Sequence, residues 1–278
     1  MKRWLGMTLP NDLDPVEFAR RIRAHALRMV FAAKSSHIGS CLSMADILAV
    51  LYTRVLRINP ARPSDPERDR FILSKGHAAA ILYAALAERG FFSTTALQTY
   101  CSEGSDLTGH ISHAVPGVEV STGSLGHGLP IAVGMALVAK AEGKAIHTYC
   151  LLSDGECDEG SNWEAILFAP HHKLDNLVAI VDFNKIQSFG RVSEVLNLDP
   201  FAEKWRAFGW HTIEVDGHDI GALERVFADA PAVRGKPTAI IAHTLKGKGV
   251  SFMEDKLEWH YKSPSSDQLA AALAEVDA

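Results

Sequence analysis

Continuous apolar runs alternate with amphipathic stretches through the second half of the chain. The runs predict strands at 146–152, 177–181, 211–215 and 238–243, and the stretches between them predict helices at 160–172, 200–208 and 220–228. Uninterrupted Val, Ile and Leu runs are typical of parallel strands that are buried on both faces. We therefore expect an α/β fold with a mainly parallel sheet and helices on both of its faces.

The first half is predicted to be largely helical. A D-x-x-E capping box at 14–17, with Pro15 at the first helical position, starts a helix whose buried side consists of Phe18, Ile22, Leu27 and Val30. A second helix is expected after Ser43, with Ile47, Leu48, Leu51 and Val55 as its buried stripe. A short strand at 71–73 then leads into a helix at about 75–89 that Gly90 closes, and a Gly- and Ala-rich helix is expected at 125–140.

Composition narrows the class of protein. The 278 residues are 47% hydrophobic and 22% charged, with a net charge of −5, which argues against disorder, a membrane span and a nucleic-acid-binding surface. Met1–Pro10 lacks the pattern of a signal peptide, so a cytoplasmic location is expected. The four cysteines show no C-x-x-C spacing, which favours reduced thiols over disulfides or a zinc site.

Acidic and amide side chains follow two of the predicted strands. The sequence S-D-G-E-C-D-E-G occupies 153–160, and D-F-N-K-I-Q occupies 182–187. Ligands of parallel sheets bind beyond the carboxyl ends of the strands. Oxygen donors from Asp154, Asn184 and the carbonyl of Ile186 suit Mg²⁺, which usually completes its coordination with substrate phosphates. Gly155 lets the backbone come close to a bound phosphate group, and the helix that begins near Gly160 directs its N–H groups toward the same region.

Two other interpretations apply to the acidic octet. An EF-hand loop requires Gly at its sixth position, where this chain has Glu159, so that interpretation fails. An acidic turn that caps a surface helix remains open on the octet alone.

The paired motifs resemble the thiamine diphosphate fingerprint, and the resemblance extends over nearly the whole chain. Motifs of the transketolase N-terminal half occur in order at S-H-I-G (36–39), R-D-R-F-I-L-S-K-G-H (68–77), G-H (109–110), G-V-E-V-S-T-G-S-L-G (117–126), T-L-K-G-K-G (244–249) and W-H (259–260). The chain is therefore similar to a transketolase N-terminal, diphosphate-binding domain. The resemblance implies a single domain over 1–278 with the thiamine diphosphate-binding fold.

The resemblance also implies roles for particular residues. Catalytic roles near the substrate oxygens fall to His37, His110 and His260. Cofactor contacts fall to His77, Gly123, Leu125, Gly155, Glu156, Asn184, Lys246 and His260. Asp154, Asn184 and Ile186 are expected to be the ligands of the metal. The metal is expected to be Mg²⁺, with Ca²⁺ or Mn²⁺ as substitutes. Taken singly, each histidine is more often structural, and Lys246 is as easily a solvated loop residue.

The sequence departs from the family pattern at several positions. Ser153 replaces the first Gly of G-D-G, Ser36 and Ile38 replace Gly and Pro, and His127 stands where Gln is common. Full transketolases continue into a pyrimidine-binding domain, with the Glu that activates the cofactor, and then a third domain. The resemblance therefore implies a partner subunit that carries both domains, with two copies of each chain.

The reaction that this family carries out is the transfer of a two-carbon ketol unit from a ketose, or its phosphate, to an aldose acceptor. An acyloin synthase subunit with a 2-oxo acid donor and a non-catalytic regulatory paralogue are the alternatives. A nicotinamide dehydrogenase is disfavoured because no G-x-G-x-x-G follows a first strand.

Overall fold

The computed structural model describes residues 13–230 and 233–278. The chain divides into two compact units, each described by itself. Unit 1 comprises Met1–Asp65, His77–Ser121 and Leu245–Ala278, and unit 2 comprises Pro66–Gly76 and Thr122–Thr244. The Met1–Pro10 segment, on which the signal-peptide argument rests, lies outside the described residues.

Unit 2 is built on a five-stranded parallel sheet in the order β1-β2-β3-β5-β4. Its strands are β1 (Arg70–Leu73), β2 (Thr148–Ser153), β3 (Leu177–Phe183), β4 (His211–Asp216) and β5 (Thr238–His243). The central strand β3 is buried along its whole length. The prediction of a parallel sheet is confirmed, and no strand end differs from the expected one by more than two residues.

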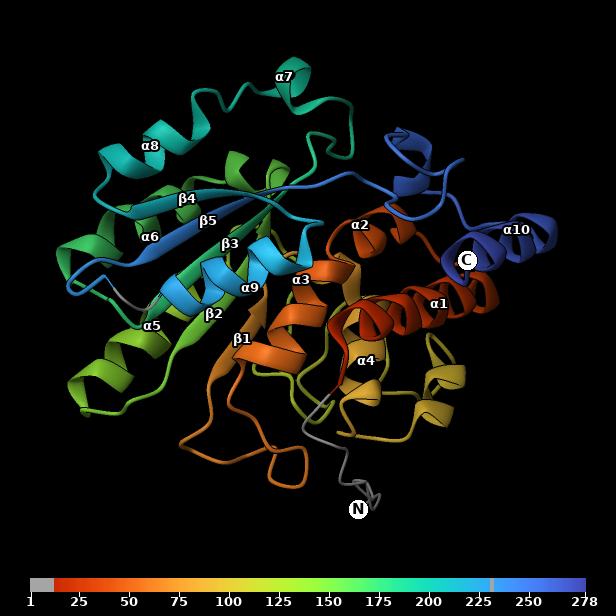
Figure 1. Ribbon diagram of the computed structural model, residues 1–278, viewed down its shortest axis with the longest axis horizontal. Helices are drawn as coiled ribbons and strands as arrows, with labels where there is room; N and C mark the ends of the chain where they lie inside the picture. The colour runs from red at the N-terminus through yellow and green to blue at the C-terminus, as the bar shows by residue number, and fades with distance from the viewer. Residues whose placement is uncertain (1–12, 231–232) are drawn as a thin grey trace. The chain divides into compact units, whose positions relative to one another are not determined.

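Helices follow the strands in the alternation that the sequence predicts. They are α5 (Gly128–Ala141), α6 (Gly160–His171), α7 (Val192–Val195), α8 (Phe201–Ala207) and α9 (Ile220–Asp229), together with the short helix η4 (Gly155–Asp158). From β1 to β4 the chain moves across the sheet in one direction, and from β4 to β5 it moves back by one strand. Because crossovers between parallel strands are right-handed, α9, which makes this return, lies on the face opposite α5 and α6. Figure 1 shows α9 in front of the sheet.

Unit 1 is helical. It contains α1 (Pro15–Ala33), α2 (Ile38–Ser43), α3 (Ala45–Val50), the π-helical turn η1 (Leu51–Val55), α4 (Ala79–Glu88), the 3-10 helices η3 (Thr94–Thr99) and η6 (Leu257–His260), and α10 (Ser266–Val276). The 3-10 turn η2 (Gly76–Ala78) precedes α4. Helix α1 packs against α3, α4 and α10, and Figure 1 shows it between α10 and α4.

Several local predictions need correction. Asp14 caps α1, but the Glu17 carboxylate pairs with Arg20 and Arg21 instead of completing a capping box. The helix expected after Ser43 is two consecutive pieces, α3 and η1, and Val55 is only half-buried. The helix α2, which ends at Ser43, was not predicted.

Other expectations agree with the structure. Gly90, with φ of +90°, follows α4 in the left-handed conformation that glycine favours. All four cysteines are free thiols. Within the described residues, no helix has the length and apolar character required to cross a membrane.

Candidate functional site

The ends of β2 and β3 bring the predicted metal donors of unit 2 together. Asp154 follows β2 directly, and Ser153 pairs in register with Asp182 of β3, so Asn184 and Ile186 leave the same edge of the sheet. The Asp154 carboxylate accepts hydrogen bonds from the backbone N–H groups of Gly155, at 2.7 Å, and Lys185. Asp154 and Asn184 are 1% and 4% exposed. Asp154 also caps the short helix η4, so the alternative of an acidic turn that caps a helix stays open.

A short hairpin supports this edge. Ile186 and Arg191 form an antiparallel bridge, and Gln187 Nε2 donates to Asp158 at 3.0 Å. A Cβ atom at Gly155 would lie 2.6 Å from Cβ of Gln187. Glycine is therefore required at 155 by the close approach of the hairpin. The prediction that Gly155 also admits an anion is not tested by this contact.

The donor set fits a hard divalent cation. A carboxylate, a side-chain amide oxygen and a backbone carbonyl leave two adjacent strand ends, and such oxygen ligands suit Mg²⁺, Mn²⁺ and Ca²⁺. Among the described residues, no three His, Cys, Asp or Glu side chains form a cluster that could hold a metal, so a zinc-type site is absent from that part of the chain.

Glu156, predicted as a cofactor contact, has its side chain directed into unit 2. It is fully buried, and its carboxylate accepts from the Ser74 hydroxyl, from Gly126 N at 3.0 Å and from Ser153 N at 3.3 Å. Burial raises the pKa of the Glu156 carboxyl, and these donors act in the opposite direction. The side chain thus links three segments of unit 2, and its contact with the cofactor stays a prediction.

The four histidines that carry the resemblance gather in unit 1. The His37 ring centroid lies 5.0 Å from His77, 6.0 Å from His110 and 5.0 Å from His260, and His77 lies 5.7 Å from His260. They come from four separate segments: the start of α2, η2, the 109–110 loop and η6. Imidazoles at this spacing can together contact the hydroxyl and carbonyl oxygens of one small molecule.

His37 is held in an unusual backbone conformation. Its φ is +74°, its N–H donates to the carbonyl of His260 at 2.9 Å, and Ser36 Oγ lies 3.2 Å from its Nδ1. Burial, followed by the charges of His110 and Lys246, lowers the pKa of His37 to about 4. His37 is therefore neutral at neutral pH, and one ring nitrogen is able to accept a hydrogen bond.

Lys246 joins this cluster. Its side chain is 1% exposed, and its Nζ lies 3.0 Å from His260 Nδ1. The solvated-loop interpretation of Lys246 is therefore wrong. Because an ammonium group only donates, Nδ1 of His260 accepts, and the imidazole proton is placed on Nε2. Gly39 permits the approach, since a Cβ there would lie 3.1 Å from Lys246 Cγ.

The remaining predicted residues lie in the connection that precedes α5. Gly123 and Leu125 are half-buried, and His127 is exposed. No hydrogen bond assigns them a role, and they stay predictions.

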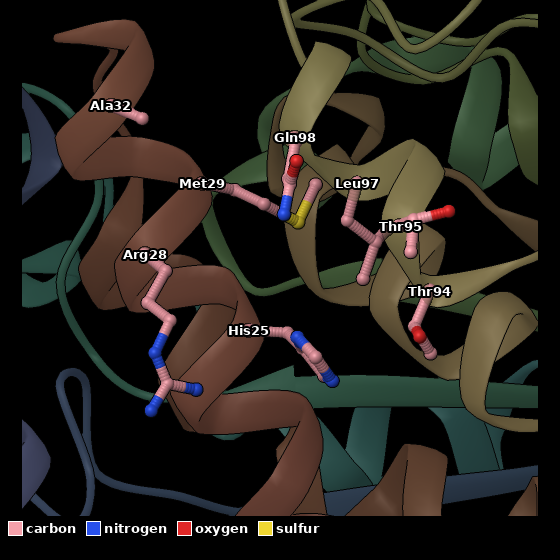
Figure 2. Close-up of a pocket in the computed structure, with 8 residues that line it drawn as sticks. All are labelled: His25, Arg28, Met29, Ala32, Thr94, Thr95, Leu97 and Gln98. Atoms are coloured by element: carbon pink, nitrogen blue, oxygen red, sulfur yellow. The ribbon is translucent and has the colours of Figure 1, made fainter.

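A groove elsewhere in unit 1 contains none of the predicted site residues. It lies between α1 and η3, and Figure 2 shows His25, Arg28, Met29, Thr95 and Gln98 among its lining residues. His25 Nε2 is bonded to Glu88 at 2.8 Å. Nothing connects this groove with the chemistry of the histidine cluster.

Three polar residues at the strand ends of unit 2 have no role in the predicted site. Lys75 forms an ion pair with Asp182, and both side chains are 0% exposed. The Thr244 hydroxyl donates to the same carboxylate. The signal that could have found them is an ionisable residue, Asp182, inside an otherwise apolar strand run, because a charge there is buried and needs a partner.

Comparison with known proteins defines the class. The family model "Transketolase, thiamine diphosphate binding domain" matches residues 16–275. The chain belongs to this family, so the resemblance drawn from the motifs is confirmed, and the fold it implies agrees with the α/β architecture.

Particular relatives narrow the class further. The chain is 42% identical over 254 residues to one of the subunits of apulose-4-phosphate transketolase from Phocaeicola vulgatus, covering 91% of this chain and 90% of that one. It is 41% identical over 268 residues to a 6-deoxy-6-sulfo-D-fructose transketolase subunit of a Clostridium species, covering 96% and 98%. These names confirm the prediction of a transketolase-type subunit.

Solved structures give the same fold. Transketolase from Campylobacter jejuni superposes with a TM-score of 0.90 at 32% sequence identity, over 98% of this chain and 43% of that one. The transketolase from Leishmania mexicana gives 0.89 at 33% identity, over 95% and 41%. This chain thus spans about two fifths of the length of those transketolases.

Proposed function

We propose that this chain is the diphosphate-binding subunit of a heteromeric transketolase-type enzyme. It holds thiamine diphosphate through a divalent cation, Mg²⁺ in the first place, and its two units serve as one cofactor-binding domain. A second subunit supplies the pyrimidine-binding and C-terminal domains, with two copies of each chain in the assembly. The enzyme acts in the cytoplasm, where its free thiols stay reduced.

The proposed reaction transfers a two-carbon ketol unit from a ketose, or its phosphate, to an aldose, or its phosphate. Support comes from the relatives that this chain matches over nearly their whole length, since both are named as subunits of transketolases acting on sugars or sugar derivatives. Thiamine diphosphate, when bound, supplies the electron sink that allows the carbon–carbon bond beside the ketose carbonyl to break.

The chain's own residues bind the cation and the diphosphate, and they transfer protons. Asp154, Asn184 and the Ile186 carbonyl hold the cation, and Gly155 and Gly123 leave room for the diphosphate. His260 presents its Nε2–H to a substrate oxygen because Lys246 occupies its Nδ1. Neutral His37 accepts a proton or a hydrogen bond, and proton transfers of this kind typically contribute about 10²–10⁴-fold to rate.

One observation carries the proposal: the oxygen donors of two adjacent strand ends are gathered by the bond from Lys185 N to the Asp154 carboxylate. A second support is the group of four imidazoles around His37.

The experiment is calorimetric titration of thiamine diphosphate into the purified full chain, with Mg²⁺ or with EDTA. Losing a partner of a metal ligand typically costs about 10–100-fold in affinity, so Asp154→Ala and Asp154→Asn, which alter a ligand itself, are expected to weaken binding by at least about 100-fold. The exposed Asp229→Ala serves as the matched control and keeps wild-type affinity. Unchanged affinity in folded Asp154 variants would refute the assignment.

A further inference from the structure

A buried charged cluster lies at the carboxyl ends of three strands of unit 2. Lys75 follows β1, Asp182 is the sixth residue of β3, and Thr244 follows β5. One Asp182 oxygen accepts from Lys75 Nζ and the other from Thr244 Oγ1. Lys75 and Asp182 have no exposed side-chain surface, so this ion pair is fully withdrawn from water. We call these three residues the charge cluster.

The charge cluster contacts the candidate metal site. Asp182 lies near the end of β3, and Asn184 directly follows that strand. Nδ2 of Asn184 donates to Oδ2 of Asp182 at 3.3 Å, the same oxygen that Lys75 contacts. This bond fixes which end of the Asn184 amide is nitrogen. The Oδ1 atom accepts a hydrogen bond from Ile186 N at 3.1 Å, and an amide oxygen has a second lone pair with which it can bind a cation.

Lys75 spans the width of two strand spacings to reach Asp182. Neighbouring strands lie about 4.8 Å apart, so β1 and β3 are separated by roughly 10 Å, with β2 and Asp154 between them. Only a long side chain crosses that gap.

The backbone on either side of Lys75 is closely packed. A Cβ at Gly76 would lie 2.4 Å from Thr122, and a Cβ at Gly128 would lie 2.3 Å from Ser74 Oγ.

The chemistry of the site explains why such a pair is useful. Asp182 is a second buried carboxylate beside Asp154, and an unpaired carboxylate there would compete for the cation and repel a diphosphate. Lys75 and Thr244 each engage one of its oxygens. With both oxygens occupied, Asp182 acts as a hydrogen-bond acceptor for Asn184 and its charge is balanced.

We propose that Lys75, Asp182 and Thr244 are positioning residues of the cofactor site. They orient the Asn184 amide toward the metal and hold Asp182 out of the ligand set, so that the site keeps a single carboxylate ligand. This inference rests on the proposed function, because it assumes that Asp154 and Asn184 hold a cation and a diphosphate.

The test compares two affinities in the full chain: that of Mn²⁺ alone, followed by the EPR signal of the free ion, and that of thiamine diphosphate with Mg²⁺, followed by calorimetry. In Lys75→Met the released Asp182 carboxylate is expected to bind Mn²⁺ more tightly, and the diphosphate is expected to bind at least about tenfold more weakly. A merely structural role would not move the two affinities in opposite directions.

Companion variants isolate the cause. The double variant Lys75→Met with Asp182→Asn removes both charges and keeps an acceptor oxygen at 182, so it is expected to recover most of the lost diphosphate affinity. Thr244→Val is expected to weaken diphosphate binding, and Thr244→Ser, which keeps the hydroxyl, to retain it. Lys236→Met, at an exposed lysine of unit 2, is the control for loss of a positive charge.

Each outcome decides one claim. Wild-type affinities for both ligands in folded Lys75→Met would overturn the inference. If Lys75→Met does not fold, equal diphosphate affinities in Thr244→Val and Thr244→Ser would overturn it instead. Absence of Mg²⁺-dependent diphosphate binding in the wild-type chain would contradict the proposed function itself.

Discussion

His37 adopts a left-handed conformation that is uncommon for residues other than glycine, and it does so beside three other imidazoles. Such backbone conformations persist where surrounding contacts hold them, and they are frequent at functional sites. Here the contact is the bond from His37 N to the His260 carbonyl, at 2.9 Å. One hydrogen bond thus fixes two of the predicted catalytic residues relative to each other.

The lowered pKa of His37 predicts a pH-dependent stability. The pKa falls from 6.5 to about 4 on folding, so between these values the unfolded chain binds more protons. The contribution of neutral His37 to the free energy of unfolding is therefore fully present above pH 6.5 and is lost as the pH is lowered toward 4. Around His37 lie His77, His110, His260 and Lys246, and the charges of His110 and Lys246 add to the cost of protonating His37.

The measurement is thermal unfolding at pH 7 and pH 5. His37→Asn, which suits a left-handed position, is expected to lose less Tm between the two values than the wild-type chain does. The exposed His171→Gln is the control and should follow the wild-type curve. An equal drop in Tm for His37→Asn and wild type would show that His37 titrates as an ordinary histidine.

At the residue scale, the family resemblance proposed roles for Asp154, Asn184 and the four histidines, and those roles stay predictions. The structure brings the histidines together and places Asp154 and Asn184 at adjacent strand ends. The partners of Lys246 and Asp182 were not predictable, because a charged side chain gives no sign in the sequence of which distant residue will neutralise it. Burial of Lys246 depends on contacts made by α2 and η6, and α2 lies near the opposite end of the chain.

At the element scale, the strands were predicted well because each apolar run is bounded by polar residues. The helix α2 was missed and α3 was not separated from η1, because the segment 38–55 contains no Pro and only one Gly to mark a boundary. Their junctions depend on tertiary packing, which outweighs local propensity. Strand ends were the most informative positions, since parallel topology alone predicts that residues after β2 and β3 share an edge.

The hairpin after β3 carries an exposed aromatic residue at its tip. Phe189 is 81% exposed, next to the bridge between Ile186 and Arg191, and Leu196 nearby is 53% exposed. If the proposed partner covers this segment, Phe189→Ser should weaken its binding by at least about tenfold, as loss of a buried aromatic at an interface typically does. Val16→Ser, at a 61% exposed position of α1, is the matched control.

The readout for this prediction is the dissociation constant of the two proteins, measured by sedimentation or light scattering. Metal binding by Phe189→Ser should equal that of wild type, since the side chain lies largely in solvent whereas the cofactor donors are buried. A wild-type dissociation constant in Phe189→Ser would place the partner on another surface.

At the scale of the whole molecule, the predicted residues are shared between the two units. The histidines and Lys246 belong to unit 1, and the oxygen donors and the charge cluster belong to unit 2. Neither unit alone contains the full set. Sequence order interleaves the units, because the chain leaves unit 1 after Asp65, returns at His77, and returns again at Leu245.

The share of each relative's length that this chain covers differs between the two kinds of relative. This chain corresponds to about two fifths of the Campylobacter jejuni transketolase, whereas it matches the relatives from Phocaeicola vulgatus and Clostridium over nearly their whole length. The proposed function accordingly places cofactor binding in this chain and cofactor activation in the proposed partner.

The most direct test of this central claim is a ketol-transfer assay on the two separately purified proteins. The full chain is assayed alone, with the partner, and with the partner after Asp154→Ala, always with thiamine diphosphate, Mg²⁺, a ketose phosphate donor and an aldose phosphate acceptor. We predict no transfer by the chain alone, transfer by the mixture, and loss of transfer with Asp154→Ala. Full transfer by the chain without its partner, or by the mixture that contains Asp154→Ala, would contradict this division of roles.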